Sequence, residues 1–401
     1  MRLAILTQYY PPEMGAPQAR LSELASRFLA RGHEVYVLTA MPNYPRGKVY
    51  PGYGGLWRRE TLDGVRVLRA ALYPSKSPRI LPRLVSYMSF VKSSAAVGLV
   101  GLPRVDVLLT ESPPLFLGLS GYVLSRLKRA RWVFNVSDLW PEGAVDLGLV
   151  KEGMALDMAR RLEAFCYRKA FLVTGQSRSI LANIEGRFPD VATHHLSNGV
   201  DPQRFSPDVG VDRARFGLPE RGLIALYAGL HGVFQGLDQI LEAAHRLRDV
   251  DDLQFVLVGD GPEKESLVAR ARALDLHNVR FLDPLPRDAM PALVAAADIS
   301  IACLKTRILG AVPSKIYEAM GAAKPVVLVA APGEATDIID DTGSGLWVEP
   351  GDLDGLAGTF RRLAKDDTLR RELGDAGRRA ALDRFDRWSI ADRFITRLET
   401  A

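Results

Sequence analysis

The chain is poor in cysteine, with only Cys166 and Cys303 among its 401 residues. One lies in a helical pattern and the other in the strand-like DISIACL, so they offer neither a disulfide framework nor the ligand spacing of a metal site. The opening MRLAILTQYYPP lacks the long apolar region and small-residue cleavage site of a secretory signal. The sequence therefore predicts a cytoplasmic protein with two core cysteines.

Blocks of like charge and low-complexity segments are missing, although the formal net charge is +5. The basic residues come without a zinc-finger spacing, a recognition-helix signature or an aromatic RNA-binding strand, so nucleic acid is not an expected partner. The diffuse positive charge favours a phosphorylated substrate or an acidic membrane surface instead.

Long uncharged runs are also missing. The most apolar stretch, residues 80–104, is interrupted by Arg83 and Lys92 before it reaches the ~20 apolar residues of a transmembrane helix. The stretch could lie on an anionic membrane surface or pack inside the protein, and the sequence leaves both open. Its basic flanks are Lys76, Arg79, Arg83 and Arg104.

Short apolar runs alternate with longer helical patterns, which indicates parallel α/β sheets covered on both faces. A second series of such runs begins near residue 222, after a segment rich in Pro, Gly and Asp. We therefore predict two domains, residues 1–197 and 198–383. The amphipathic end of the chain, residues 384–401, is expected to pack back on the first domain.

In the predicted first domain, polar residues follow strand ends, where open parallel sheets bind ligands. Gly15 is the only glycine in the turn after the first strand, whereas a dinucleotide fingerprint needs three. A single glycine can still let backbone N–H groups approach an anion or a sugar closely. Asp138 and Glu142 follow the strand WVFNV and could orient or deprotonate a hydroxyl group. An ordinary turn at Gly15 and a helix cap at Asp138 are the alternatives.

In the predicted second domain, LYAGLHGVFQG has the same plan of strand, loop and helix. Gly229 opens the loop, and His231 and Gln235 are candidate ligands for phosphate, with a structural loop histidine as the alternative. Further on, the helix start PSKIYEAM places Ser314, Lys315 and Glu318 near one another at the positive end of a helix. Glu318 is one place too late for a capping box, so a favourable helix-end charge or ligand binding are its two interpretations.

The combination of YYPPEMGAPQAR, SNGVDPQRFSP, VLVGDGPEKESL, PSKIYEAMGAAKPVV and GSGLWVEPGD resembles the retaining glycosyltransferases of family 4. The resemblance covers nearly the whole chain. It implies a GT-B fold, with two Rossmann-like domains whose parallel sheets face a cleft. It also implies transfer of a sugar from a nucleotide diphosphate sugar, UDP-linked in our reading, to a sugar acceptor such as a polyprenyl-diphosphate-linked one at the membrane.

The DLWPE segment is similar to a bacterial subgroup that includes N-acetylfucosamine transferases of surface polysaccharide synthesis. Two other functions stay open from the residues. One is a sugar-nucleotide epimerase or hydrolase of the same fold. The other is a non-catalytic nucleotide-sugar-binding protein.

The resemblance assigns Glu318 to the donor ribose hydroxyls, as the second acid of the family's E-x7-E motif. The first acid falls at Gly310, so that contact is missing or moved. The basic residues of the family's phosphate loop are replaced near His231 and at Gln235. The diphosphate charge is therefore assigned to Lys305, Arg307, Lys315 and the helix amides near Ser314, with Lys315 in a catalytic role.

No metal or other cofactor is expected. Asp249 and Asp251 spell the Asp-x-Asp that binds a metal–nucleotide pair in other sugar transferases, but they precede the strand LQFVLVG, at its amino end. Ligands bind beyond carboxyl ends, so this pair is interpreted as a solvated turn. Ser137 stands where many family members have a histidine, so a mechanism that needs that histidine is not expected.

Overall fold

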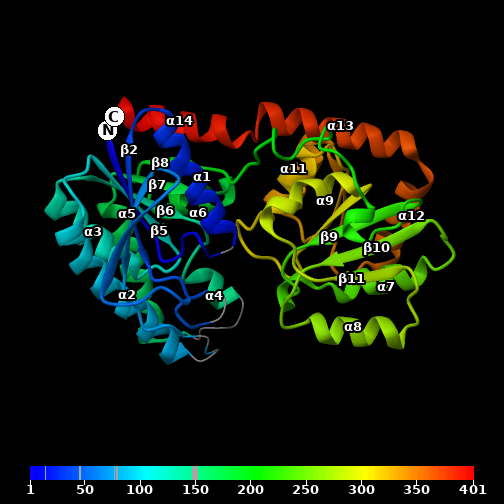
Figure 1. Ribbon diagram of the computed structural model, residues 1–401, viewed down its shortest axis with the longest axis horizontal. Helices are drawn as coiled ribbons and strands as arrows, with labels where there is room; N and C mark the ends of the chain where they lie inside the picture. Colours follow the sequence, from blue (N-terminus) through cyan, green and yellow to red (C-terminus); the bar gives the residue numbers. More distant parts are fainter. Residues whose placement is uncertain (14, 45–46, 76, 78–79, 147–151) are drawn as a thin grey trace. The chain divides into compact units, whose positions relative to one another are not determined.

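The computed structural model describes residues 1–13, 15–44, 47–75, 77, 80–146 and 152–401, and the chain forms two compact units (Figure 1). Unit 1 comprises Met1–Ser197, Ile308–Gly310 and Trp388–Ala401, and unit 2 comprises Asn198–Arg307 and Ala311–Arg387. Each unit has its own mostly parallel sheet with helices on both faces, so the predicted α/β class is confirmed.

The sheet of unit 1 has the strand order β3-β4-β2-β1-β5-β6-β7-β8, and only β3 runs antiparallel to its neighbour. The chain order reverses beside β1, which makes the carboxyl ends of β1 and β5 the place where such sheets bind ligands. The strands are β1 (Arg2–Leu6), β2 (Glu34–Ala40), β3 (Trp57–Leu62), β4 (Val65–Ala70), β5 (Val107–Ser112), β6 (Arg131–Val136), β7 (Leu172–Gly175) and β8 (Thr193–His195).

Helices cover both faces of this sheet because its central strands are apolar on both sides. One face carries α2 (Ile80–Gly101), α3 (Leu117–Lys128), α5 (Met154–Lys169) and α6 (Arg178–Arg187), and the other carries α1 (Ala16–Ala30) and α14 (Arg387–Glu399). The chain's last helix is anchored on α1: the rings of Phe28 and Phe394 are 6.2 Å apart, and Arg27 pairs with Asp392. The short α4 spans Glu142–Asp146.

Unit 2 is built around an all-parallel sheet with the order β11-β10-β9-β12-β13-β14. Here the chain order reverses between β9 and β12. Its strands are β9 (Leu223–Ala228), β10 (Leu253–Val258), β11 (Val279–Leu282), β12 (Ile299–Cys303), β13 (Val326–Val329) and β14 (Gly345–Val348). Its helices are η1 (Ala214–Phe216), η2 (Val233–Gln235), α7 (Asp238–Arg246), α8 (Lys264–Ala273), η3 (Arg287–Ala289), α9 (Met290–Ala296), α10 (Ser314–Gly321), α11 (Glu334–Thr342), α12 (Leu353–Lys365) and α13 (Asp367–Asp383).

The apolar stretch at residues 80–104 forms helix α2. From Leu81 on, this helix is long and apolar enough to cross a bilayer by length and composition, the only one among the described residues to be so. Its inner side is nevertheless part of the core of unit 1, because Phe90 and Ser94 are fully buried and Ser94 Oγ lies 2.9 Å from Ser120 Oγ on α3. The inner face of α2 therefore packs inside unit 1, as one of the two alternatives for this stretch expected. Lys76 and Arg79 lie outside the described residues.

Candidate functional site

A buried polar network lies at the carboxyl edge of the unit 1 sheet. Arg20 on α1 donates from Nη2 to Glu111 Oε1 at 2.5 Å and to Ser137 Oγ at 2.7 Å, and the Ser137 hydroxyl also bonds Glu111. All three side chains are at least nine-tenths buried. A charge removed from water costs several kcal/mol unless it is paired, so Arg20 and Glu111 depend on each other.

The same network fixes the neighbouring strand ends. Asn135 Nδ2 donates to Glu111 Oε2 at 2.6 Å, and Thr174 Oγ1 donates to Asn135 Oδ1 at 2.6 Å. Gln176 accepts from Arg20 at 3.0 Å and donates to the Ser137 carbonyl. Residues from β5, β6, β7 and α1 are thus held together where the loop after β6 begins.

Asp138 is the next residue along and, unlike Ser137, is exposed. The chain crowds its carboxyl group on the remaining sides, and this desolvation raises its pKa; the Glu111 carboxylate adds to the rise and Arg20 opposes it. Its side chain makes no hydrogen bond with the described backbone, and α4 begins only at Glu142. The helix-cap alternative for Asp138 is therefore wrong, and the carboxyl group stays open to solvent.

Glu142 and Gly15 are less well placed than Asp138. Glu142 is engaged by Arg160 Nε at 3.2 Å, which reduces its availability as a base. Gly15 precedes α1 with φ of 164°, an extended conformation that any residue adopts, so the backbone does not require glycine there. It is exposed at the helix start, where Pro17 leaves the first turn of α1 with one N–H donor fewer.

The glycine turns of unit 2 are locked together by backbone contacts. Gly229 and Gly259 have φ of 151° and 145°, values that favour glycine, and any side chain at 259 would collide with the Gly229 carbonyl. The Gly229 amide donates to the Val258 carbonyl at 2.8 Å, and the amide of His231 donates to the Asp260 carbonyl at 2.9 Å. The loops after β9 and β10 therefore form one rigid backbone surface.

Lys315 reaches this surface from α10. Its Nζ lies 2.6 Å from the position that a Cβ at residue 229 would occupy, and 5.0 Å from the centroid of the Tyr227 ring. Burial lowers its pKa, and the nearby Glu318 carboxylate acts in the opposite direction. Glu318 is partly exposed one turn further along α10 and forms no ion pair or side-chain hydrogen bond with the described residues. The structure thus brings Gly229, Lys315 and Glu318 to one place.

Lys305 and Gln235 flank the same edge. The Lys305 amide donates to the Phe234 carbonyl at 2.7 Å, and its exposed Nζ lies 3.7 Å from Asp238. Gln235 is partly buried, and its Oε1 has no hydrogen-bond partner among the described residues. Ser314 is the first residue of α10, and no side chain among the described residues caps that helix. The Ile316 amide donates to the Pro313 carbonyl at 3.1 Å, which leaves the amides of Ser314 and Lys315 open to an anion.

His231 is not placed as a ligand. Its side chain is fully buried between Tyr227 and Phe281, with ring centroids 5.9 and 6.3 Å away. Burial, assisted by the charge of Lys264, lowers its pKa and keeps the ring neutral. His231, which the sequence suggested as a phosphate ligand, packs inside the protein under its own loop. The alternative interpretation as a structural loop histidine therefore fits the geometry better.

The structure gives physical reasons for two sequence interpretations, the missing first acid at Gly310 and the solvated turn at Asp249. Gly310 has φ of 77°, so a side chain at the position of the first acid would be strained. Asp249 precedes β10 and is bound by Arg361 at 2.6 and 2.9 Å, which leaves it engaged at the amino edge of the sheet.

Sequence reasoning missed Arg20 and Glu111. Glu111 carried a signal, because it is an acidic residue at the end of the apolar run VDVLLT. Arg20 carried none, since an arginine in an amphipathic helix usually faces solvent.

Two α/β units, each with an open polar carboxyl edge, define the architecture of a GT-B glycosyltransferase. The model of "Glycosyl transferase 4-like domain" matches residues 15–199 and that of "Glycosyl transferases group 1" matches residues 208–380. The chain belongs to glycosyltransferase family 4, and it is an enzyme of that class.

Its relatives and structural neighbours agree with this assignment. The chain is 30% identical over 392 residues to the putative colanic acid biosynthesis glycosyl transferase WcaI of Escherichia coli, covering 94% of this chain and 96% of that one. It is 28% identical to the probable glycosyltransferase WbjE of Pseudomonas aeruginosa, over 66% and 67% of the two chains. The crystal structure of Anabaena HepE in complex with UDP-glucose has a TM-score of 0.74 at 18% identity, with complete coverage of both chains.

Proposed function

We propose that the protein transfers a sugar, with retention of configuration, from a UDP-linked sugar to a sugar acceptor carried on a polyprenyl diphosphate. The reaction would serve bacterial surface polysaccharide synthesis at the cytoplasmic face of the membrane. The observation that carries the proposal is the position of Lys315 against the Gly229 turn, beside the open amides of α10. A lysine and the free N–H groups of a helix start are groups that bind phosphate in proteins, which supports the proposal.

The geometry suits a nucleoside diphosphate. Lys315 supplies a partly desolvated cation, the helix start supplies N–H donors, and Lys305 lies at the other side of the loop. Glu318, one turn from Lys315, can accept hydrogen bonds from ribose hydroxyls. A leaving diphosphate gains negative charge in the transition state, so fixed donors at this place would accelerate its departure.

The names of similar proteins support the finer assignment. WcaI is described as acting in colanic acid biosynthesis, and HepE was solved with UDP-glucose. A family 4 enzyme that uses a UDP-sugar to build a surface polysaccharide is consistent with both of these similar proteins. An N-acetylated deoxysugar such as N-acetylfucosamine is one donor to be included in a screen.

The decisive experiment is a thermal-shift screen of nucleotide sugars, followed by mass analysis of products with a polyprenyl diphosphate sugar acceptor. An acceptor enlarged by one sugar supports transfer. Donor converted or hydrolysed without change in the acceptor would identify an epimerase or hydrolase, and binding without turnover would identify a binding protein.

Glu318→Gln is expected to weaken binding of UDP and of the donor by about tenfold or more, because a hydrogen bond to a charged group contributes about 1.5 to 3 kcal/mol. Isothermal titration with UDP measures the effect. Glu265→Gln, which removes an acid from the first turn of α8, is the matched control and should leave affinity unchanged. Equal affinities in Glu318→Gln and wild type would remove Glu318 from the site.

Sugar transfer is expected to continue in excess EDTA, because the diphosphate charge is assigned to Lys315, Lys305 and the amides of α10. Initial rates with and without chelator check this. Activity that is lost in EDTA and restored by Mn²⁺ or Mg²⁺ would contradict the assignment. It would also return attention to Asp249 and Asp251.

A further inference from the structure

The outer surface of α2 and α3 is apolar and carries charge of one sign. Helix α2 carries Arg83 and Lys92, helix α3 carries Arg126 and Lys128, and neither helix contains Asp or Glu. The helical spacing puts the exposed apolar residues of each helix on one stripe. The exposed residues are Leu81, Val85, Leu99 and Val100 on α2, and Leu119, Val123 and Leu127 on α3.

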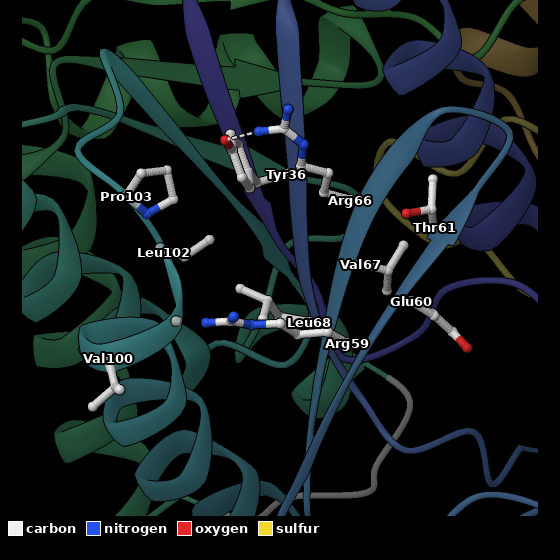
Figure 2. A pocket seen from close by; sticks show the side chains of 11 residues that line it. Tyr36, Arg59, Glu60, Thr61, Arg66, Val67, Leu68, Val100, Leu102 and Pro103 are labelled. Atoms are coloured by element: carbon white, nitrogen blue, oxygen red, sulfur yellow. Dashed lines mark hydrogen bonds between the residues drawn. The ribbon is translucent and has the colours of Figure 1, made fainter.

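A groove of about 620 Å³ adjoins the C-terminal end of α2 (Figure 2). Strand β3 extends the sheet beyond this helix, so the sheet face beside it is left uncovered. The register pairs Arg59 with Leu68 and Thr61 with Arg66, which puts these four residues on that face. Leu102 and Val100 form the apolar wall opposite.

Arg59 is the available cation of the groove. Arg66 is already bound to Glu34 at 3.2 Å and to the Tyr36 hydroxyl. The guanidinium of Arg59 stacks over the Trp57 ring at 4.9 Å and makes no ion pair or hydrogen bond within the described residues. Figure 2 shows its side chain extending across the groove towards the end of α2.

We propose that this groove binds the phosphate of an anionic phospholipid while the α2–α3 surface lies on the bilayer. A guanidinium matches a phosphate group with two parallel hydrogen bonds, and the exposed stripes can enter the boundary between headgroups and acyl chains. Helices α2 and α3 contain no acids, and Glu60, an acid that lines the groove, is already paired with Arg69, so the positive charge of this surface complements an anionic leaflet. Exposed Trp57 belongs to the residue type that favours this interface.

Within unit 1, the groove is separate from the edge that carries the polar network and Asp138. It lies at the C-terminal end of α2, whereas the polar network and Asp138 lie at the carboxyl ends of the strands, where α2 begins. The inference therefore goes beyond the proposed sugar transfer. It is also tested without it, because vesicle binding needs no nucleotide sugar.

The test is sedimentation of the full chain with vesicles of phosphatidylcholine alone or with phosphatidylglycerol added. Binding is expected mainly to the anionic vesicles. Val100→Glu should weaken it by about tenfold, because it removes an apolar group and adds a repelled charge. Arg59→Gln should weaken it by about tenfold or more, because it removes a charge-assisted hydrogen bond to phosphate.

Lys92→Gln is the matched control. Lys92 is exposed on the same stripe of α2 but does not line the groove, so its loss should cost about fivefold through the surface field alone. If Arg59→Gln and Lys92→Gln lose the same vesicle affinity, the effect is one of diffuse surface charge, and phosphate binding in the groove is contradicted. Equal binding of wild type to neutral and anionic vesicles, or none to either, would overturn the whole proposal. Unfolding temperatures of all variants should match wild type, since these side chains are exposed.

Discussion

Replacing Lys315 with Met is expected to lower kcat/KM for sugar transfer by about 10²- to 10³-fold, the cost of removing one fixed donor to a developing charge. Lys315 is the cation held directly against the Gly229 turn, and its amine is partly desolvated, so its attraction to phosphate oxygens is poorly screened. Steady-state kinetics with the donor found in the screen measures the loss.

The matched control is Lys305→Met. Lys305 is exposed and faces Asp238, so its removal should cost less than tenfold. If the two variants lose activity equally, the charge is shared around the loop. Wild-type kinetics in Lys315→Met would move the diphosphate contact to Lys305 or Arg307.

The lowered pKa of Lys315 adds a pH dependence. The amine is charged below its pKa, so kcat/KM should fall as pH rises through that lowered value, earlier than for an ordinary lysine. Lys315→Arg keeps the charge at high pH and should remove this alkaline decline if the guanidinium fits beside Gly229.

The sequence was sufficient for the fold because its signal is repeated. Each strand is a short run apolar on both faces, and each is followed by an amphipathic helix, so the pattern predicts buried parallel sheets without knowledge of distant contacts. The meeting of Lys315 with Gly229 was also predictable in outline. Both follow or adjoin carboxyl ends of strands, which a parallel sheet gathers at one edge.

Side-chain partners across the fold were not predictable. Arg20 bonds Glu111 and Ser137 across separations of 91 and 117 residues, and no local pattern marks such pairs. His231 was interpreted as a ligand because it lies in a loop between glycines. Its burial arises from Tyr227 and Phe281, whose positions only the tertiary structure gives.

The side-chain partners that distinguish Glu142 from Asp138 were likewise not predictable. Both follow the strand WVFNV, and the position of Asp138 directly after that strand already favours it over Glu142. The structure adds a second reason, because Arg160 engages Glu142, whereas the side chain of Asp138 has no hydrogen-bond or ion-pair partner in the described chain. Asp138 is therefore the stronger candidate for the acceptor.

Asp138→Asn is expected to lower kcat by about 10²-fold or more while UDP affinity stays within twofold of wild type, because positioned proton acceptors contribute roughly 10² to 10⁴. The exposed carboxyl group can accept a hydrogen bond from the attacking hydroxyl, and an amide oxygen accepts it more weakly. Its raised pKa has a direct consequence. Activity that depends on the carboxylate should decline as pH falls through a value above that of an ordinary Asp, and this acid limb should be missing in the Asn variant.

Glu111→Gln separates positioning from acceptor contact. The Glu111 carboxylate raises the pKa of Asp138 and is hydrogen bonded to Asn135 and Ser137, so its neutralisation should shift the acid limb to lower pH. It also leaves Arg20 without its ion pair, and a lower unfolding temperature is expected. A purely structural effect would lower stability and active fraction without moving the limb.

Asp138→Asn protein that is folded, binds UDP and transfers sugar at the full rate would remove Asp138 from the reaction. The acceptor hydroxyl would then have to lose its proton to the departing diphosphate, which would lie on the same face of the sugar if the reaction proceeds with the retention proposed above.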